Sequence, residues 1–166
     1  MARSRPPRRH WVGGGLISRP GAAGHEWIET TTGLADLVDR LAGEPAIGLD
    51  TEFHRERTYF PKVALVQLAW PAGVALVDAV AVDMASLAPL LHRTTVVMHA
   101  AAQDLEVLAH AAGVVPPTLF DTQLAACFAG YGNPSLGSLI AGELGIKVAK
   151  GDRLADWLRR PLHKGQ

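Results

Sequence analysis

Apolar residues recur at two spacings along most of the chain, and the order of these spacings predicts a layered α/β fold. Apolar positions three and four residues apart favour helices, whereas short unbroken or alternating apolar runs favour strands. Helices are expected at residues 32–43, 83–92, 103–112, 122–129, 135–145 and 154–158, and strands at residues 46–49, 63–70, 74–77, 95–98 and 119–120. Because Pro71-Ala72-Gly73 joins the second and third strands in a tight turn, these strands should form a hairpin. The central sheet should therefore be mixed rather than all parallel.

Residues 1–25 show no such periodicity. They are rich in Pro, Gly and Arg, so we interpret them as a flexible basic leader, and the folded part should begin near Trp27. The length of 166 residues suits one domain, and the 48% share of apolar residues indicates a sizeable packed core. We therefore expect a single folded domain over residues 26–166.

The net charge of zero hides an uneven distribution. Five arginines and no acids occur in residues 1–20, which leaves 11 basic against 16 acidic residues in the rest of the chain, a net charge of −5. A second basic segment, residues 147–164, has six Lys or Arg residues against Asp152 and Asp156. These segments are either a disordered leader and solvated helix faces or contacts for a phosphate backbone, and charge alone does not decide between them.

The sequence gives no sign of membrane insertion or secretion. No apolar run approaches the roughly 18–20 residues that cross a bilayer. The basic start is interrupted by residues 13–15, all glycine, before any apolar stretch, which argues against a cleaved secretory signal. Cys127 is the only cysteine, so an internal disulfide is excluded, and a reducing cytoplasm is the simplest expected compartment.

Two acidic residues follow the first predicted strand. Asp50 and Glu52 lie two positions apart after residues 46–49, so in an extended chain both carboxylates point to one face while Thr51 points away. Like charges at this spacing repel, and a bound divalent cation is the usual means of neutralising them. An isolated Asp-x-Glu, however, is more often the beginning of a solvated loop.

Asp104 lies in the first turn of the helix that follows the strand at residues 95–98. In an open α/β sheet, functional groups gather beyond the carboxyl ends of the strands. If the strands that carry Ile47 and Val96 are neighbours, Asp104 can converge on Asp50 and Glu52. An acid at a helix start also stabilises the helix dipole by about 0.3–1 kcal/mol, and spacing alone does not separate these two interpretations.

Four segments carry a recognisable pattern: DTEFHRERTYFPKVALVQLA at residues 50–69, HAAAQDLEVL at 99–108, FDTQLAA at 120–126 and KGDRLADWLRRPL at 150–162. The first closely resembles the first exonuclease motif of the ribonuclease D family, and the second resembles the second motif of that family. The other two are similar to family stretches further along. The four segments occur in the family's order over residues 26–162, so on this resemblance the chain is identified as a member of the family.

The resemblance implies a ribonuclease H-like fold, with a mixed central sheet flanked by helices. It also implies four acidic ligands that hold two Mg²⁺ or Mn²⁺ ions about 3.5–4 Å apart. Three of these ligands, which are also the catalytic residues, correspond to Asp50, Glu52 and Asp104. The implied activity is that of a 3′→5′ exoribonuclease acting on the single-stranded 3′ end of RNA such as tRNA precursors. The acids themselves do not distinguish RNA from DNA, and neither a protein partner nor a membrane is evident.

Other residues near the predicted site have weaker assignments. Phe53 follows the acid pair and would either stack on a terminal base or belong to the core. His99 ends its strand near the site and is a candidate for nucleic-acid contact, although a histidine there is more often a hydrogen-bonded part of the scaffold. In the family's pattern Asp121 is a helix cap rather than the fourth ligand, and Trp157 is expected to anchor the short helix at residues 154–158.

The family's third motif is a Tyr followed four residues later by Asp, shortly after the segment that ends at Leu162. Only residues 163–166 follow that segment, and neither Tyr59 nor Tyr131 has Asp at that spacing. We therefore expect the domain to lack its last helix and the metal site to lack one ligand, which would weaken or abolish activity. The alternative is a non-catalytic nucleic-acid-binding remnant of such an enzyme.

Overall fold

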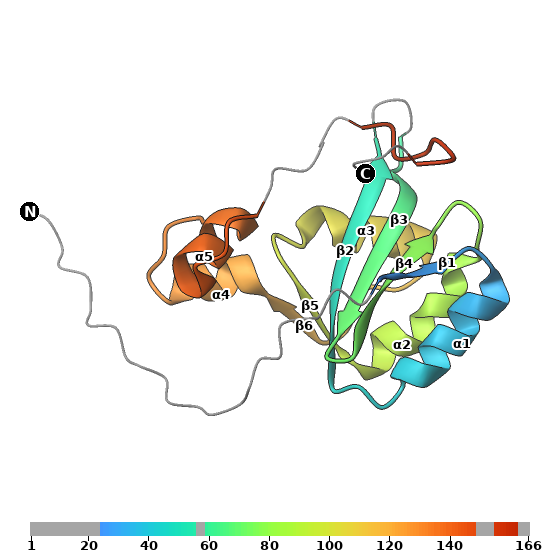
Figure 1. The fold of residues 1–166 in the computed structure, drawn as a ribbon, viewed down its shortest axis with the longest axis horizontal. Helices are drawn as coiled ribbons and strands as arrows, with labels where there is room; N and C mark the ends of the chain where they lie inside the picture. Colours follow the sequence, from blue (N-terminus) through green and yellow to red (C-terminus); the bar gives the residue numbers. More distant parts are fainter. Residues whose placement is uncertain (1–23, 56–58, 149–154, 163–166) are drawn as a thin grey trace, which may run out of the picture.

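A mixed six-stranded sheet forms the centre of the molecule (Figure 1). The computed structural model describes residues 24–55, 59–148 and 155–162, so almost all of the predicted leader lies outside the described residues. The strands are β1 (Glu26–Ile28), β2 (Ala46–His54), β3 (Lys62–Trp70), β4 (Gly73–Asp78), β5 (Thr95–Met98) and β6 (Leu119–Asp121), in the spatial order β1-β4-β3-β2-β5-β6. The pairs β2–β3 and β3–β4 are antiparallel and the other three pairs are parallel, which confirms the predicted mixed sheet.

The helices begin close to where the apolar spacing predicts them. They are α1 (Thr31–Leu41), the 3₁₀ helix η1 (Met84–Leu87), α2 (Ala88–Arg93), α3 (Ala102–Ala111), α4 (Thr122–Phe128) and α5 (Leu136–Leu144). Polar side chains satisfy their first free N–H groups: the Thr30 hydroxyl accepts from Gly33 and the Ser135 hydroxyl from Ser138. None of the described helices has both the length and the apolarity that spanning a membrane requires.

The central strand β2 is longer than the apolar run indicates. That run predicts a strand ending at Leu49, but β2 continues to His54 because β3 pairs with it as far as Lys62. The two acids therefore lie inside β2 rather than after its end. On the other side β5 pairs with β2 only up to Gly48, so beyond Gly48 this edge of β2 has no partner among the described strands.

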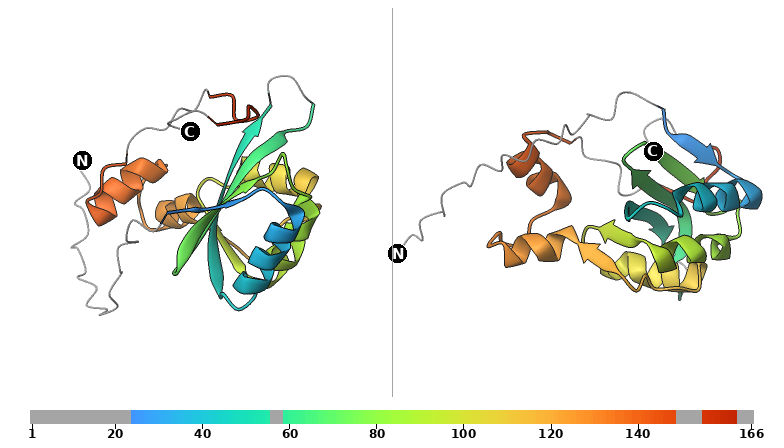
Figure 2. Two further views of the ribbon diagram at one scale, coloured as in Figure 1. Left: turned by 45° about the vertical axis from the view of Figure 1, so that its right-hand side comes forward. Right: turned by 90° about the horizontal axis from the view of Figure 1, so that it is seen from below.

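Helices α1, α2 and α3 cover one face of the sheet (Figure 2). Ile47, Leu49 and Thr51 of β2 are buried on this face. The core there also contains large side chains from the helices and from β3, β4 and β5: Leu34, Leu37, Leu41, Leu68, Leu90, Leu91, Leu108, Val66, Val77 and Val96. Because side chains alternate along a strand, Asp50 and Glu52 point to the opposite face, where Asp50 is exposed.

Helices α4 and α5 extend beyond β6, at the edge of the sheet (Figure 1). Helix α5 has no buried residue, although most of its residues are apolar or glycine. Several apolar side chains of this pair are accessible, and Phe128 at the end of α4 is 93% exposed. Gly145 adopts the left-handed conformation that ends α5, with φ of 69°.

Residues 155–162 are anchored to the sheet by Arg160. Its Nε and Nη2 donate to the two carboxylate oxygens of Asp78 at 2.7 and 2.6 Å, and Nη2 also donates to the Ala64 carbonyl at 2.8 Å. Its Nη1 donates to the carbonyls of Trp157 and Arg159. The guanidinium therefore joins this segment to β3 and β4 at the same time.

The helix predicted at residues 154–158 is wrong over the described residues 155–158, which form a bend and a turn. The Trp157 carbonyl accepts from the Arg160 side chain, and the Trp157 N–H donates to Ala155, only two residues back. These bonds replace the regular helical pattern. Residue 154 lies outside the described residues.

Replacing Arg160 with Met should destabilise the fold by about 3 kcal/mol, because it leaves the Asp78 carboxylate buried without its cation. The side chains of Arg160 and Asp78 are only 25% and 8% exposed. Urea unfolding at pH 7 measures the loss, with Arg159→Met, at the exposed neighbouring position, as the matched control. Equal stability of the two variants would contradict the anchoring role.

The loss of folding stability caused by Arg160→Met should also depend on pH. Burial by itself raises the pKa of Asp78, but Arg160 and the backbone N–H groups of Val80 and Ala81 lower it overall. A carboxyl whose folded pKa lies below its unfolded pKa stabilises the fold at higher pH, and this contribution is lost as the pH falls through the folded pKa. The difference between the two proteins should therefore shrink in acid.

Candidate functional site

Strand β2 presents two carboxylates on the face of the sheet that is opposite to α1, α2 and α3. Asp50 is exposed and Glu52 half-buried, and in β3 they lie opposite Gln67 and Leu65. A register shift follows directly after Glu52. Adjacent residues of opposite orientation are buried, so the two acids are held two positions apart on a rigid central strand.

Helix α3 brings Asp104 to the edge of β2 that β5 leaves unpaired. Ile47 pairs with Val96, so the strand before α3 is the direct neighbour of β2, as the site prediction requires. Asp104 is in the first turn of α3 and is 9% exposed. The Thr51 hydroxyl donates to Asp104 Oδ1 at 2.6 Å, which fixes the start of α3 against β2 between the two other acids.

The sequence pattern assigns no role to Thr51, because its side chain points away from its two acidic neighbours. The structure places that hydroxyl under the third acid instead. A signal was present, since a hydroxyl residue at a buried strand position needs a hydrogen-bond partner. What the sequence does not contain is the position of α3 relative to β2.

The turn that leads into α3 is held by Asp121. Its carboxylate accepts from the N–H groups of Ala100 and Ala101 at 3.1 and 2.9 Å, as well as from Gln123 at 2.8 Å at the start of α4. Ala100 adopts a left-handed conformation with φ of 58°, which is unfavourable for a residue with a Cβ. Asp121 is thus a cap, as the family pattern indicates, and it also stabilises the strained turn on which the placement of Asp104 depends.

The three acids behave as one electrostatic unit. Although Asp50 is accessible, the surrounding protein partly desolvates its carboxylate, and this desolvation and the nearby Asp104 raise its pKa above the ordinary value. Burial, followed by Asp50 and Asp104, raises the pKa of Glu52 to about 7. Burial also raises the pKa of Asp104, although the bond from the Thr51 hydroxyl opposes this change. Asp121 also raises the pKa of Asp104. Asp104 therefore disfavours the ionisation of Asp50 and Glu52, and Asp50 that of Glu52, which leaves excess negative charge at this edge of β2.

Carboxylate oxygens are the ligands that Mg²⁺ and Mn²⁺ prefer, so the chemistry of this donor set fits a hard divalent cation. Within residues 24–55, 59–148 and 155–162, however, no three His, Cys, Asp or Glu side chains are already arranged to surround a metal ion. One oxygen of Asp104 is held by Thr51. Cation binding would therefore involve rotation of these side chains rather than occupation of a preformed cage.

His99 and Phe53, the candidates for nucleic-acid contact, are both held in part by contacts within the fold. The Thr122 hydroxyl donates to the Met98 carbonyl, so it accepts from Nδ1 of His99, 2.9 Å away. Nε2 of His99 is buried without a hydrogen-bond partner in the described structure, and the ring lies close enough to Asp50 to oppose the rise in the pKa of that acid. Phe53 is half-buried and packs against the hydrophobic core.

The chain is similar to known exonucleases over almost the whole described fold. The sequence model of a family described as 3′-5′ exonuclease matches residues 25–166. A ribonuclease D of Acidiphilium cryptum is 45% identical over 144 residues, which cover 84% of this chain and 37% of that protein. A ribonuclease D of Xanthomonas oryzae is 46% identical over 147 residues, 84% of this chain and 39% of that protein. The chain thus spans less than two-fifths of the length of these relatives.

Solved structures with the same fold include an RNase D and the catalytic core of RRP6. The crystal structure of Escherichia coli RNase D superposes with a TM-score of 0.80 and 36% identity, covering 85% of this chain and 39% of that one. The catalytic core of RRP6 from Trypanosoma brucei superposes with a TM-score of 0.75 and 26% identity, covering 90% of this chain and 41% of that one. Sequence and structure comparisons therefore agree on the family.

Replacing Glu52 with Gln should stabilise the metal-free protein above pH 7. The pKa of Glu52 is about 7 in the fold, against an ordinary value of 4.5. Between pH 4.5 and about 7 the folded state keeps a proton that the unfolded chain has released. The stability of the unchanged protein therefore falls as the pH rises through this range. The Gln variant has no carboxyl at this position, so its stability does not decline for this reason.

Urea unfolding at pH 4, 6 and 8 in the presence of a chelator tests this expectation. The two proteins should have similar stabilities at pH 4, and the variant should be the more stable one at pH 8. Glu44→Gln, just before the other end of β2, is the control and should follow the unchanged protein. An unchanged protein whose stability does not decline between pH 4 and 8 would contradict the repulsion among the three acids.

Proposed function

Because the chain belongs to the 3′-5′ exonuclease family and is similar to its ribonuclease D members, we propose that it is a metal-dependent 3′→5′ exoribonuclease domain. The observation that carries this proposal is that Asp104 lies close enough to β2 to raise the pKa of both Asp50 and Glu52, while Asp50 raises the pKa of Glu52. Such a site is suited to holding cations against a phosphodiester. Since the relatives are much longer than this chain, the proposal concerns the domain and not the activity of a whole relative.

We assign Asp50, Glu52 and Asp104 as the residues that hold the ions and act in catalysis. Two bound Mg²⁺ or Mn²⁺ ions would supply an activated water and stabilise the leaving 3′ oxygen. Thr51 orients Asp104 through its hydroxyl, and Asp121 maintains the turn before α3. These two residues act through Asp104 and are positioning residues.

The proposed substrate is the single-stranded 3′ end of RNA. The Escherichia coli relative is described as an exoribonuclease involved in structured RNA processing, which supports RNA over DNA for this chain. His99 and the accessible part of Phe53 are proposed to contact the terminal nucleotide, since both lie beside the acids. A preference for RNA would require contacts to the 2′-hydroxyl. A cytoplasmic location stays a prediction.

The alternative, a non-catalytic nucleic-acid-binding remnant, would depend on the basic segments. Residues 1–20 and much of residues 147–164 lie outside the described residues. Arg160, one of the six basic residues of the second segment, is committed to Asp78 and is poorly placed to bind phosphate. The cleavage experiment below distinguishes the two functions.

Asp50→Asn and Asp104→Asn should each lower RNA cleavage by about a thousandfold or more, because ligands of one metal site act as a unit. The measurement follows the shortening of a 5′-labelled single-stranded RNA in Mg²⁺ or Mn²⁺. Asp36→Asn, at an exposed position of α1, is the matched control and should cleave like the unchanged chain. Cleavage that survives both Asn substitutions together would show that the site assignment is wrong. Salt-sensitive RNA binding without any cleavage would support the remnant.

Mg²⁺ or Mn²⁺ should stabilise the folded chain, because a cation relieves the repulsion among three carboxylates. At a concentration of about 100 times the dissociation constant, the gain is about 2.7 kcal/mol. Thermal unfolding with and without the cation, at matched ionic strength, measures it. The gain should disappear when Asp50→Asn and Glu52→Gln are combined, and an equal gain in that double variant would place the cation elsewhere.

A further inference from the structure

Two exposed aromatic side chains, Tyr59 and Phe60, lie between β2 and β3. Tyr59 is 89% exposed and Phe60 is 53% exposed. Their rings meet edge to face, with centroids 4.9 Å apart and planes at 88°. Two adjacent aromatic rings with this exposure form an apolar patch, and apolar patches of this kind are candidate binding surfaces because their area is otherwise left in water.

Helix α3 holds this aromatic pair in place. The Phe60 ring packs on the His110 ring, with centroids 4.2 Å apart, near the end of α3. Arg55 makes a two-pronged ion pair with Glu106, at 2.9 and 3.0 Å, one turn earlier in the same helix. Phe60 is therefore held in place, and Tyr59 packs against it. Together these two rings form an aromatic platform, and little conformational entropy would be lost when it binds a ligand.

The aromatic pair is linked to both elements that carry the acids, β2 and α3. Tyr59 and Phe60 follow β2 in the sequence, and Phe60 packs on His110 of α3, which lies about 9 Å along that helix from Asp104 at 1.5 Å per residue. Stacked nucleotides are spaced about 3.4 Å apart along one strand. A strand whose 3′ end is at the acids would thus reach the aromatic pair about three nucleotides upstream.

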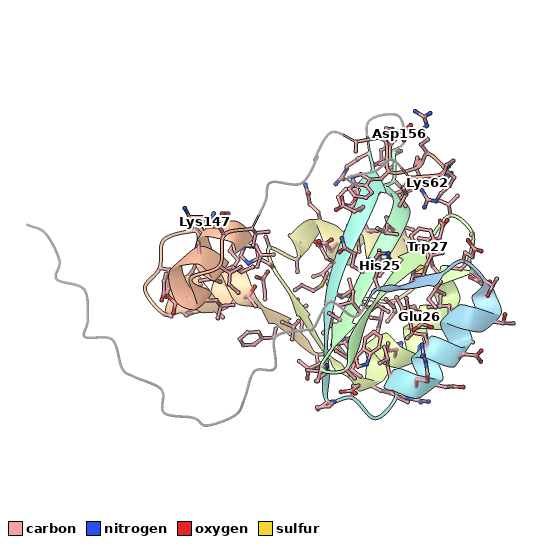
Figure 3. All side chains as sticks on the ribbon, in the orientation of Figure 1. His25, Glu26, Trp27, Lys62, Lys147 and Asp156 are labelled. Atoms are coloured by element: carbon pink, nitrogen blue, oxygen red, sulfur yellow. The ribbon has the colours of Figure 1, made fainter. Side chains whose placement is uncertain are left out.

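The charge of the surroundings suits a nucleic acid. Lys62 is exposed at the first position of β3, opposite His54, and Figure 3 shows it at the end of the sheet where β2 and β3 are joined. Arg55 neutralises Glu106 through their ion pair, so this acid adds no net negative charge beside Lys62. Cationic side chains beside accessible aromatic rings are the combination with which proteins bind single strands without regard to sequence.

We propose that Tyr59, supported by Phe60 and His110, stacks against an unpaired base upstream of the RNA 3′ end and so forms a second binding position outside the acid site. This inference rests on the proposed function for its ligand, single-stranded RNA. It predicts that affinity depends on the length of the unpaired tail and not on its base sequence.

Fluorescence anisotropy with labelled oligoribonucleotides of two, four, six and eight residues tests the proposal. The full chain is used in Ca²⁺, so that turnover is suppressed. Tyr59→Ala should weaken the binding of the six- and eight-residue strands about tenfold, as expected for the loss of one stacked base, and leave the dinucleotide unchanged. Phe128→Ala, which removes an equally exposed aromatic ring from α4, should leave all four affinities unchanged.

A second arm places one abasic residue at successive positions of the eight-residue strand. At one upstream position the abasic strand should bind the unchanged chain and Tyr59→Ala equally, because the stacking partner is missing in both. Equal binding of all strands by Tyr59→Ala and the unchanged chain would overturn the proposal, as would an equal loss for the dinucleotide or no RNA binding at all. Thermal unfolding checks that Tyr59→Ala is folded.

The two proposals can fail separately. Tyr59→Ala should keep the stabilisation by Mg²⁺, whereas Asp50→Asn combined with Glu52→Gln should lose it. If the acid variants behave as expected and Tyr59→Ala binds every strand normally, only the stacking position is wrong. If the length dependence is found but the acid variants still respond to cations and cleave, the acid site is the assignment that fails.

Discussion

Repulsion among three carboxylates at one edge of β2 is the constraint on which this structure depends. Asp50 and Glu52 are held on one face by the alternation of a strand, and Asp104 is brought to them by a helix from a different part of the chain. Burial and proximity make their joint ionisation unfavourable. An arrangement of this kind reduces stability unless a cation is bound, which is the expected trade-off between stability and activity.

The rest of the fold resists that repulsion. β2 is one of the two central strands of the sheet, and β3 pairs with it over most of its length and β5 with its first residues. Thr51 binds Asp104 directly, and Asp121 holds the turn at Ala100. On the far side of β3, Arg160 attaches residues 155–162 to Asp78. The contacts of Thr51 and Asp121 fix the start of α3, whose movement would let the acids separate.

The sequence predicted the fold well where one local pattern decides the outcome. Apolar spacing located α1, β3, β4, β5 and α3. The pairing of the strands that carry Ile47 and Val96 is a condition of the site prediction that the sequence leaves open, and the structure meets it. The sequence did not predict the structure where distant contacts decide. β2 extends past Leu49 because β3 supplies a partner, and residues 155–158 form a turn because Arg160 competes for the backbone carbonyls. Neither the role of Thr51 nor the support of Phe60 by His110 has a signal in local spacing.

An NMR titration of the Glu52 side-chain carboxyl carbon tests the central claim most directly, in metal-free protein with and without Asp104→Asn. Convergence of the three acids predicts a midpoint near pH 7 in the unchanged chain. The midpoint should be clearly lower in the variant, because one neighbouring charge has been removed. A midpoint near 4.5 in both proteins would show that the carboxylates do not share one site.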